Sequence, residues 1–126
     1  MAKRTKGQIR ASKTKGANHE YDTKASLLPV FPNMLLTKEL GFVKQYDLVD
    51  EKESIAIECK FHKKMSWNEA KKLYAKLKNK AAKYQTHYLI YKTNQQPVLV
   101  MSEVNVSRSI MVMEFEDMFG VPFVKH

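Results

Sequence analysis

The chain has 126 residues, of which 44% are hydrophobic, and a formal net charge of +9. This length and hydrophobic content predict one folded domain with its own core and exclude global disorder. A single cysteine, Cys59, excludes an internal disulfide, and no apolar run reaches the length of a membrane span. We therefore expect a soluble intracellular protein, located in the cytoplasm or in the host cytoplasm if the chain is viral.

Positive charge is concentrated in two segments. Residues 1–16 contain six basic residues and no acid, and residues 60–83 contain nine lysines and one acid, Glu69. Such blocks favour binding to a polyanion, because each neutralised phosphate releases condensed counterions. A charged surface that only keeps the protein soluble is the alternative. Residues 1–16 also lack apolar periodicity, so we predict a flexible basic arm followed by a folded domain over residues 17–126.

Two helices are predicted at the start of the folded domain. The first runs from about residue 17 to residue 28 and is ended by Pro29 and Pro32, whose rings are incompatible with a continuing helix. The second covers residues 33–40 and ends at Gly41, a residue type that is common after the last turn of a helix.

A hairpin and a third helix are predicted next. Residues 42–49 and 54–61 have the composition of two strands, joined by a loop at 50–53. Ser66, with Glu69 three positions later, forms a capping box that predicts the start of a helix. That helix would bury a stripe formed by Trp67, Ala70, Tyr74, Leu77 and Ala81.

The last third of the chain is predicted to be mainly strand. Strands are expected at residues 86–92, 98–101 and 110–115, followed by a helical turn at 116–119. The order of helix, hairpin, helix and further strands predicts an α/β fold with a mixed sheet.

An acid and a base interrupt the apolar pattern of the strand at residues 54–61. Glu58 and Lys60 lie two positions apart, so they share one face of the strand. An exposed ion pair that contributes about 0–1 kcal/mol is the simplest interpretation of such a pattern.

The preceding strand supplies a second acid on the same face. A loop that places Val49 opposite Ser54 puts Asp47 opposite Ala56, one diagonal step from Glu58. The small Ala56 would leave room for the two carboxylates to converge on one ion. Mg²⁺ is the expected ion, because it prefers oxygen ligands and retains several waters. The histidines and the single cysteine lack the spacing of zinc ligands.

Two neighbouring groups complete this hypothetical site. The backbone carbonyl of Cys59 is placed to supply another ligand, whereas its thiol faces the apolar side and is expected to be buried. Lys60 would orient or deprotonate a water, or stabilise charge on a phosphate. The pattern therefore favours phosphodiester hydrolysis.

These residues resemble the signature of a known family. Asp47 followed by Glu58-Cys59-Lys60 is similar to the D…(D/E)-x-K pattern of the PD-(D/E)XK nucleases. The chain is most similar to archaeal and viral Holliday-junction resolvases, which open with a Lys/Gly-rich segment before a helix that carries a glutamate. Here that segment is K-T-K-G-A-N-H-E, which ends at Glu20, and the resemblance covers about residues 13–92.

The resemblance implies a restriction-endonuclease-like mixed β-sheet flanked by helices. It also implies Mg²⁺-dependent DNA cleavage, with Mn²⁺ as a substitute, and a homodimer that acts on branched DNA. Tyr46 stands where the family often has a proline, and Glu39 is a rival to Glu20 as the helix acid. The implied active-site residues are Glu20, Asp47, Glu58 and Lys60, and the implied metal ligands are Asp47, Glu58, Glu20 and the Cys59 carbonyl.

Several basic residues would contact the DNA backbone without reading its sequence. They are Lys3, Arg4, Lys6, Arg10, Lys13, Lys15, His62, Lys63, Lys64, Lys72 and Lys76. Two other functions fit the charge pattern: a restriction- or transposition-type endonuclease on duplex DNA, and a non-catalytic nucleic-acid-binding protein. A chain of this size has no room for a separate sequence-reading domain, which favours recognition of DNA shape and hence of junctions.

Overall fold

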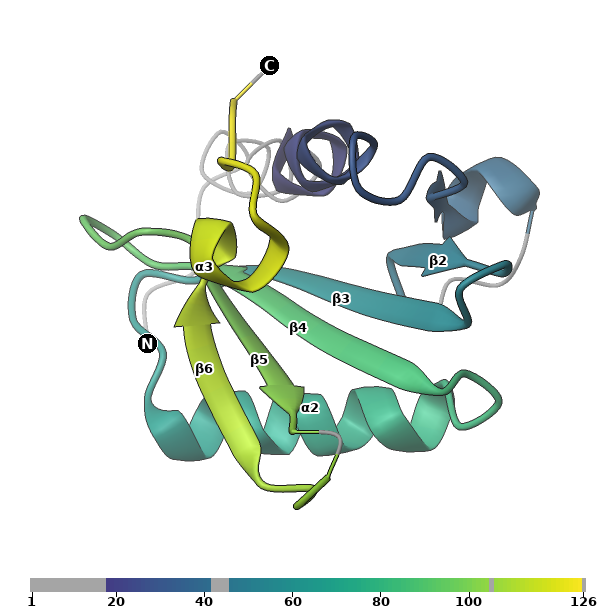
Figure 1. Ribbon diagram of the computed structural model, residues 1–126. Coiled ribbons are helices and arrows are strands. Elements are labelled where there is room, and N and C mark those ends of the chain that lie inside the picture. Colours follow the sequence, from purple (N-terminus) through teal and green to yellow (C-terminus); the bar gives the residue numbers. More distant parts are fainter. Residues whose placement is uncertain (1–17, 42–45, 105, 126) are drawn as a thin grey trace, which may run out of the picture.

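The computed structural model describes residues 18–41, 46–104 and 106–125. Its centre is one six-stranded sheet in which the strands follow one another in chain order (Figure 1). The strands are β1 (Leu35–Leu36), β2 (Leu48–Asp50), β3 (Ile55–Phe61), β4 (Thr86–Lys92), β5 (Leu99–Glu103) and β6 (Ile110–Glu114). Strands β3 and β4 are parallel and every other neighbouring pair is antiparallel, which confirms the predicted α/β class and mixed sheet.

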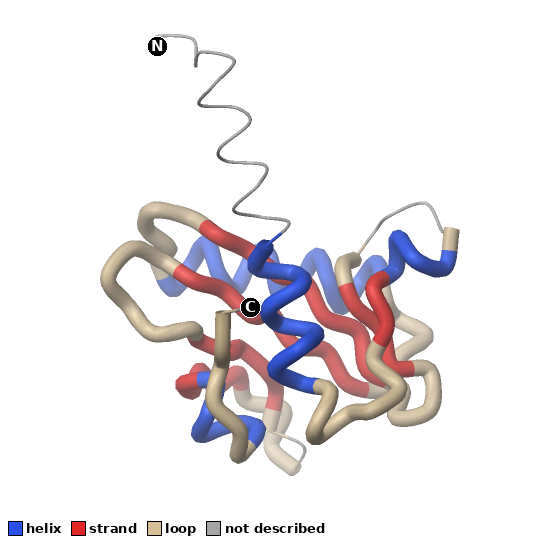
Figure 2. The backbone as a smooth tube through the Cα atoms, turned by 90° about the horizontal axis from the view of Figure 1, so that it is seen from above, coloured by secondary structure: helices blue, strands red, loops and turns tan. Residues whose placement is uncertain are grey.

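Helices cover both faces of the sheet. Helix α2 (Trp67–Lys80) connects β3 to β4 and lies on one face (Figure 1). The N-terminal helix, described over residues 18–27, crosses the opposite face, as the view from above shows (Figure 2). The short helix α3 (Phe115–Phe119) lies on that same face.

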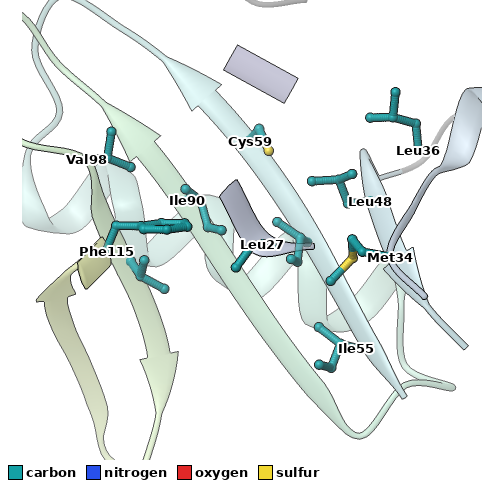
Figure 3. Close-up of a cluster of buried hydrophobic side chains, with 11 residues drawn as sticks. Leu27, Met34, Leu36, Leu48, Ile55, Cys59, Ile90, Val98 and Phe115 are labelled. Carbon is teal, nitrogen blue, oxygen red and sulfur yellow. The ribbon is translucent and has the colours of Figure 1, made fainter. Parts of the chain in front are cut away.

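Each face has its own buried side chains. Between the sheet and the N-terminal helix, Leu27 packs with Leu48, Cys59 and Ile90 (Figure 3). On the α2 side, Ala56 packs with Leu77 and Ala81, and a neighbouring cluster contains Tyr74, Leu89 and Met101. Burying a side chain such as Leu or Ile contributes about 1.5–3 kcal/mol. These two layers hold β3, the strand that carries Glu58, in the middle of the fold.

The segment over residues 33–40 differs from the predicted helix. Leu35–Leu36 pairs with β2 as the edge strand β1, and only Thr37–Leu40 forms a helical turn, of the 3-10 type. The backbone N–H of Thr37 donates to the carbonyl of Asp47 at 3.0 Å, so pairing with a distant strand replaces local helical bonds. Gly41 ends the turn with φ of 71°, at the predicted stop.

Two further differences concern strand and core assignments. The strand predicted over residues 42–49 begins at Leu48 in the described structure, and residues 42–45 lie outside it. Trp67, which was predicted to be a core residue, is 50% exposed because it lies on the flank of the first turn of α2. The rest of the predicted stripe is buried.

The predicted cap of α2 is confirmed. Ser66 has an extended backbone, and its hydroxyl accepts a hydrogen bond from the Glu69 N–H at 3.1 Å. Replacing Ser66 with alanine should lower the free energy of unfolding by about 1 kcal/mol, measured by urea denaturation. Ser66→Thr retains the acceptor and should lose less. An unchanged midpoint for Ser66→Ala would show that the cap does not stabilise the fold.

Within residues 18–41, 46–104 and 106–125, no helix is both long enough and apolar enough to cross a membrane.

Candidate active site

The β2–β3 hairpin has a different register from the predicted one. Val49 pairs with Ala56 and not with Ser54, so the loop covers residues 51–54. The strand pairing ends with Leu48 opposite Ile57, and the Asp47 N–H donates to that same Ile57, so Asp47 does not lie opposite Ala56 as predicted. A hydrogen bond between the Asp47 and Glu58 side chains makes the two acids neighbours.

The turn explains the shift in register. Ser54 has φ of 56°, in the left-handed region, and the Asp50 carboxylate accepts a hydrogen bond from the Glu53 N–H at 3.0 Å. These features extend β2 through Asp50 and close the turn one residue later than predicted. Asp50, which was predicted to lie in the loop over residues 50–53, is instead the last residue of β2 and is fully buried, and only its side chain takes part in the turn. Ala56 does not open space between the acids, because it is fully buried against α2.

Asp47 is fixed by hydrogen bonds to its backbone and its side chain. Its N–H donates to the Ile57 carbonyl at 2.9 Å, and its carbonyl accepts the Thr37 N–H. Its carboxylate Oδ2 accepts the Cys59 N–H at 2.7 Å. Only 4% of Asp47 is exposed, so this carboxylate is held in one position beside β3.

Glu58 lies beside Asp47 and Lys60. The Lys60 Nζ is 3.6 Å from Glu58 Oε1, and 14% of the Glu58 side chain is exposed. Burial and the negative charge of Asp47 raise the pKa of Glu58 to about 7, and a hydrogen bond with Asp47 acts in the same direction. The positive charges of Lys60 and Lys80 oppose this shift. The three predicted residues Asp47, Glu58 and Lys60 therefore meet at one place.

The chemistry of the pair fits a divalent cation. Without an ion, burial and the repulsion from Asp47 both disfavour the charged form of Glu58, and together they raise its pKa. A hard cation between Asp47 and Glu58 would remove the repulsion, and Mg²⁺ can bind through as few as one or two carboxylates while it retains waters. Among the described residues, no group of three or more His, Cys, Asp or Glu side chains forms a metal-binding cluster.

The backbone of Cys59 is directed toward the same place. Its N–H donates to Asp47, and the N–H and carbonyl of one strand residue project toward the same neighbouring strand. The carbonyl therefore faces the side on which Asp47 lies, as a ligand would. The Cys59 thiol is buried, and burial, followed by the charge of Asp47, raises its pKa well above the ordinary value. The thiol remains protonated, as expected for a buried residue with no nucleophilic role.

Glu20 and Glu39 lie in different surroundings. Glu20 is 8% exposed on the N-terminal helix, and its charge contributes to the raised pKa of Cys59, whose thiol faces that helix. Its Oε2 is 3.9 Å from the Lys38 Nζ. Glu39 is exposed and pairs with Lys24 at 3.1 Å. Of the two rival acids, Glu20 is therefore the one that lies near Cys59.

A cavity of about 760 Å³ is separate from the carboxylate site. His19, Phe61, Lys92 and Phe123 are among its lining residues, which do not include Asp47, Glu58 or Lys60. Burial lowers the pKa of His19, whose Nε2 lies 3.2 Å from the Ile90 carbonyl oxygen. The carboxylate site lies instead at the end of the sheet where β2 begins, between the inner strands β2 and β3.

The predicted DNA-contacting residues of the described chain lie on the surface. Lys63 and Lys64, after β3, are exposed, as are Lys72 and Lys76 on α2, while His62 is half-buried. Lys3, Arg4, Lys6, Arg10, Lys13 and Lys15 lie outside the described residues.

Lys80 was not predicted to belong to this surface. It lies in the last turn of α2, and its charge acts on Glu58. Its spacing of four residues puts it in line with Lys76 on the helix, but the sequence does not show which strand that side of α2 faces.

Comparison of the chain with protein-family models, with curated proteins and with solved structures finds no match. The functional argument therefore rests on the arrangement of Asp47, Glu58 and Lys60.

Proposed function

We propose that the protein is a Mg²⁺-dependent DNA endonuclease that hydrolyses phosphodiester bonds and acts on four-way junctions. One observation carries the proposal: Asp47, Glu58 and Lys60 meet on neighbouring strands, and the Glu58 carboxylate is disfavoured there without a cation. A buried carboxylate pair is typical of a functional site, because it opposes folding unless something binds it.

The architecture supports the family that the sequence resembles. The acids lie on the β2–β3 hairpin, and α2 then leads to the parallel strand β4, with helices on both faces of the sheet. We propose that this is a restriction-endonuclease-like core of the PD-(D/E)XK type.

The residues of the site would have different roles in cation binding and in catalysis. Asp47 and Glu58 would hold Mg²⁺ or Mn²⁺ with the Cys59 carbonyl, and Glu20 would bind through the hydration shell of the ion. A divalent cation supplies Lewis acidity at the phosphate and lowers the pKa of the attacking water. Lys60 would take a proton from that water or stabilise the charge that develops on the phosphate.

A protein that only binds nucleic acid is the weaker alternative. Two carboxylates that face a phosphate backbone repel it, so a pure binder gains nothing from Asp47 and Glu58. A homodimer would bring two sites to opposing strands of a junction inside the cell.

The test is to incubate purified protein and Mg²⁺ with labelled four-way, flapped and linear DNA. We expect paired nicks confined to the junction, and loss of all nicks with Glu58→Ala. Glu53→Ala, an exposed acid in the same hairpin, is the matched control and should cut normally.

Each alternative has its own result in this assay. Equal cutting of the linear duplex would identify a restriction- or transposition-type endonuclease. Binding without cutting in either Mg²⁺ or Mn²⁺ would identify a non-catalytic binder. Cutting by Glu58→Ala at the normal rate would show that the site is misassigned.

A further inference from the structure

The two flanks of α2 face different strands. On one flank, the Lys78 ammonium pairs with Glu103 at the end of β5. On the other flank, the charge of Lys80 acts on Glu58, which lies on β3. Leu77 and Ala81, the neighbours of Lys80 in α2, pack against Ala56, which shares a strand face with Glu58, so this end of the helix lies under the part of the sheet that carries the carboxylate site (Figure 1).

Three lysines of α2 form a row that begins on the flank beside the site and, because each step of four residues turns by about 40°, ends on the face of the helix turned away from the sheet. Lys72, Lys76 and Lys80 are spaced by four residues, so on a helix of 3.6 residues per turn they form one inclined row. At a rise of about 1.5 Å per residue, the row extends about 12 Å along α2. All three side chains are exposed. The row therefore runs from the neighbourhood of Glu58 along the helix toward its N-terminus.

This row differs from the other lysines of α2. Lys78 has the Glu103 carboxylate, and the Lys71 Nζ lies 5.9 Å from the centroid of the Trp67 ring. Within the described part of the chain, Lys72 and Lys76 form no ion pair. Like charges four residues apart destabilise a helix. A polyanion bound along this row would remove the repulsion between the lysines.

We propose that Lys80, Lys76 and Lys72 form a phosphate track that binds the backbone of the strand cut at Asp47 and Glu58. This inference rests on the proposed nuclease function and extends it to how the substrate runs across the enzyme. Lys80 is the positioning residue next to the scissile phosphate, and it offsets the repulsion between that strand and the carboxylates. Lys76 and Lys72 then hold successive parts of the same strand on one side of the site.

The first test is DNA binding in EDTA, so that no strand is cut. Each of Lys72→Gln, Lys76→Gln and Lys80→Gln should weaken binding of a four-way junction about five- to eight-fold at 0.1 M salt. Each should also reduce the slope of log K against log salt by about 0.7–0.9. Lys71→Gln removes the same charge from the other flank and should leave both quantities unchanged.

The helix dipole offers a competing structural role for Lys80. A cation in the last turn of a helix stabilises it whether or not DNA is present. Lys78→Gln is also a last-turn change, so it controls for this effect. If Lys78→Gln weakens binding as much as Lys80→Gln, the track is wrong.

The second test locates the track on the substrate. Junctions are prepared with one neutral methylphosphonate at successive positions on either side of the cut. With Lys80→Gln, the neutral group nearest the cut on one side should cause no further loss of binding, because the lysine and that phosphate form one contact. Additive losses at every position on both sides would overturn the assignment.

The failure of this inference can be told apart from failure of the proposed function. If wild-type protein cuts junctions but the track and control variants bind alike, only the track is wrong. If wild-type protein neither binds nor cuts DNA, both proposals are wrong. If Lys72→Gln, Lys76→Gln and Lys80→Gln weaken binding to folded RNA but leave binding to DNA unchanged, the proposed phosphate track for DNA is also wrong.

Discussion

Replacing Glu58 with glutamine should abolish strand cleavage and at the same time stabilise the metal-free protein at pH 8. Cleavage should fall at least about 100-fold, because a cation ligand supplies several kcal/mol of transition-state stabilisation. Stability should rise by about 1–3 kcal/mol, since a neutral amide costs less to bury than a carboxylate, does not repel Asp47, and has an N–H that can donate to that carboxylate. Urea denaturation in EDTA measures the second effect.

The gain in stability has a defined pH dependence. The pKa of Glu58 is raised from its ordinary value of 4.5 to about 7 in the folded protein, so the folded state binds more protons between these values. The contribution of Glu58 to stability is therefore full below pH 4.5 and is lost as the pH rises through 7. Glu58→Gln should remove this loss. The advantage of Glu58→Gln should accordingly be small at pH 5 and largest at pH 8.

Glu53→Gln, at the exposed end of the same hairpin, is the control for both effects. It should leave cleavage and stability close to those of the wild type at every pH. A Glu58→Gln protein that is less stable than the wild type at pH 8 would show that the acid has a structural role.

Replacing Asp47 with alanine should also abolish cleavage, but it should destabilise the protein. The Asp47 carboxylate accepts the buried Cys59 N–H at 2.7 Å, and alanine leaves that donor without its acceptor. Loss of a buried hydrogen-bond partner costs about 1–3 kcal/mol. Relief of repulsion on Glu58 offsets part of this cost, so the net loss should lie at the lower end of the range.

Asp47→Asn separates the two roles of this residue. Its amide oxygen still accepts the Cys59 N–H, so stability should stay near that of the wild type while cleavage is lost. The measurements are urea midpoints in EDTA and junction cleavage in Mg²⁺. Normal cleavage by Asp47→Asn would exclude Asp47 from the cation site.

Glu58→Gln and Asp47→Ala are expected to change stability in opposite directions, and this difference would separate a functional role from a structural one. If the charged residues were retained only to stabilise the fold, both substitutions would lower the free energy of unfolding. A carboxylate retained to bind a cation opposes folding when the cation is absent, as the raised pKa of Glu58 indicates. We expect Glu58 to be retained for cation binding alone, and Asp47 to be retained both for cation binding and for its hydrogen bond to Cys59.

The elements that depend on local signals were predicted well from the sequence. The capping box at Ser66 and the apolar periodicity after it located α2, and the short apolar and aromatic run T-H-Y-L-I-Y-K located β4. These signals lie within a few residues of the element they specify. The face shared by Glu58 and Lys60 followed from the period of a strand.

The features that the sequence missed depend on distant contacts or on turn geometry. Strand β1 forms because Leu35–Leu36 meets β2, a contact that no local pattern records. The hairpin register depends on Ser54 taking a left-handed conformation, which is uncommon for residues other than glycine. The contribution of Lys80 at the site required knowledge of how α2 is rotated over β3.

The most direct test of the cation site is the thermal stability of the protein as Mg²⁺ is titrated at pH 8. The account predicts that the melting temperature of wild-type protein rises with Mg²⁺ concentration, since a ligand that binds only the folded state stabilises it by mass action. Glu58→Gln and Asp47→Asn should show no such rise, while Glu53→Gln should follow the wild type. An equal rise in all four proteins, or no rise in any of them, would contradict a cation site at Asp47 and Glu58.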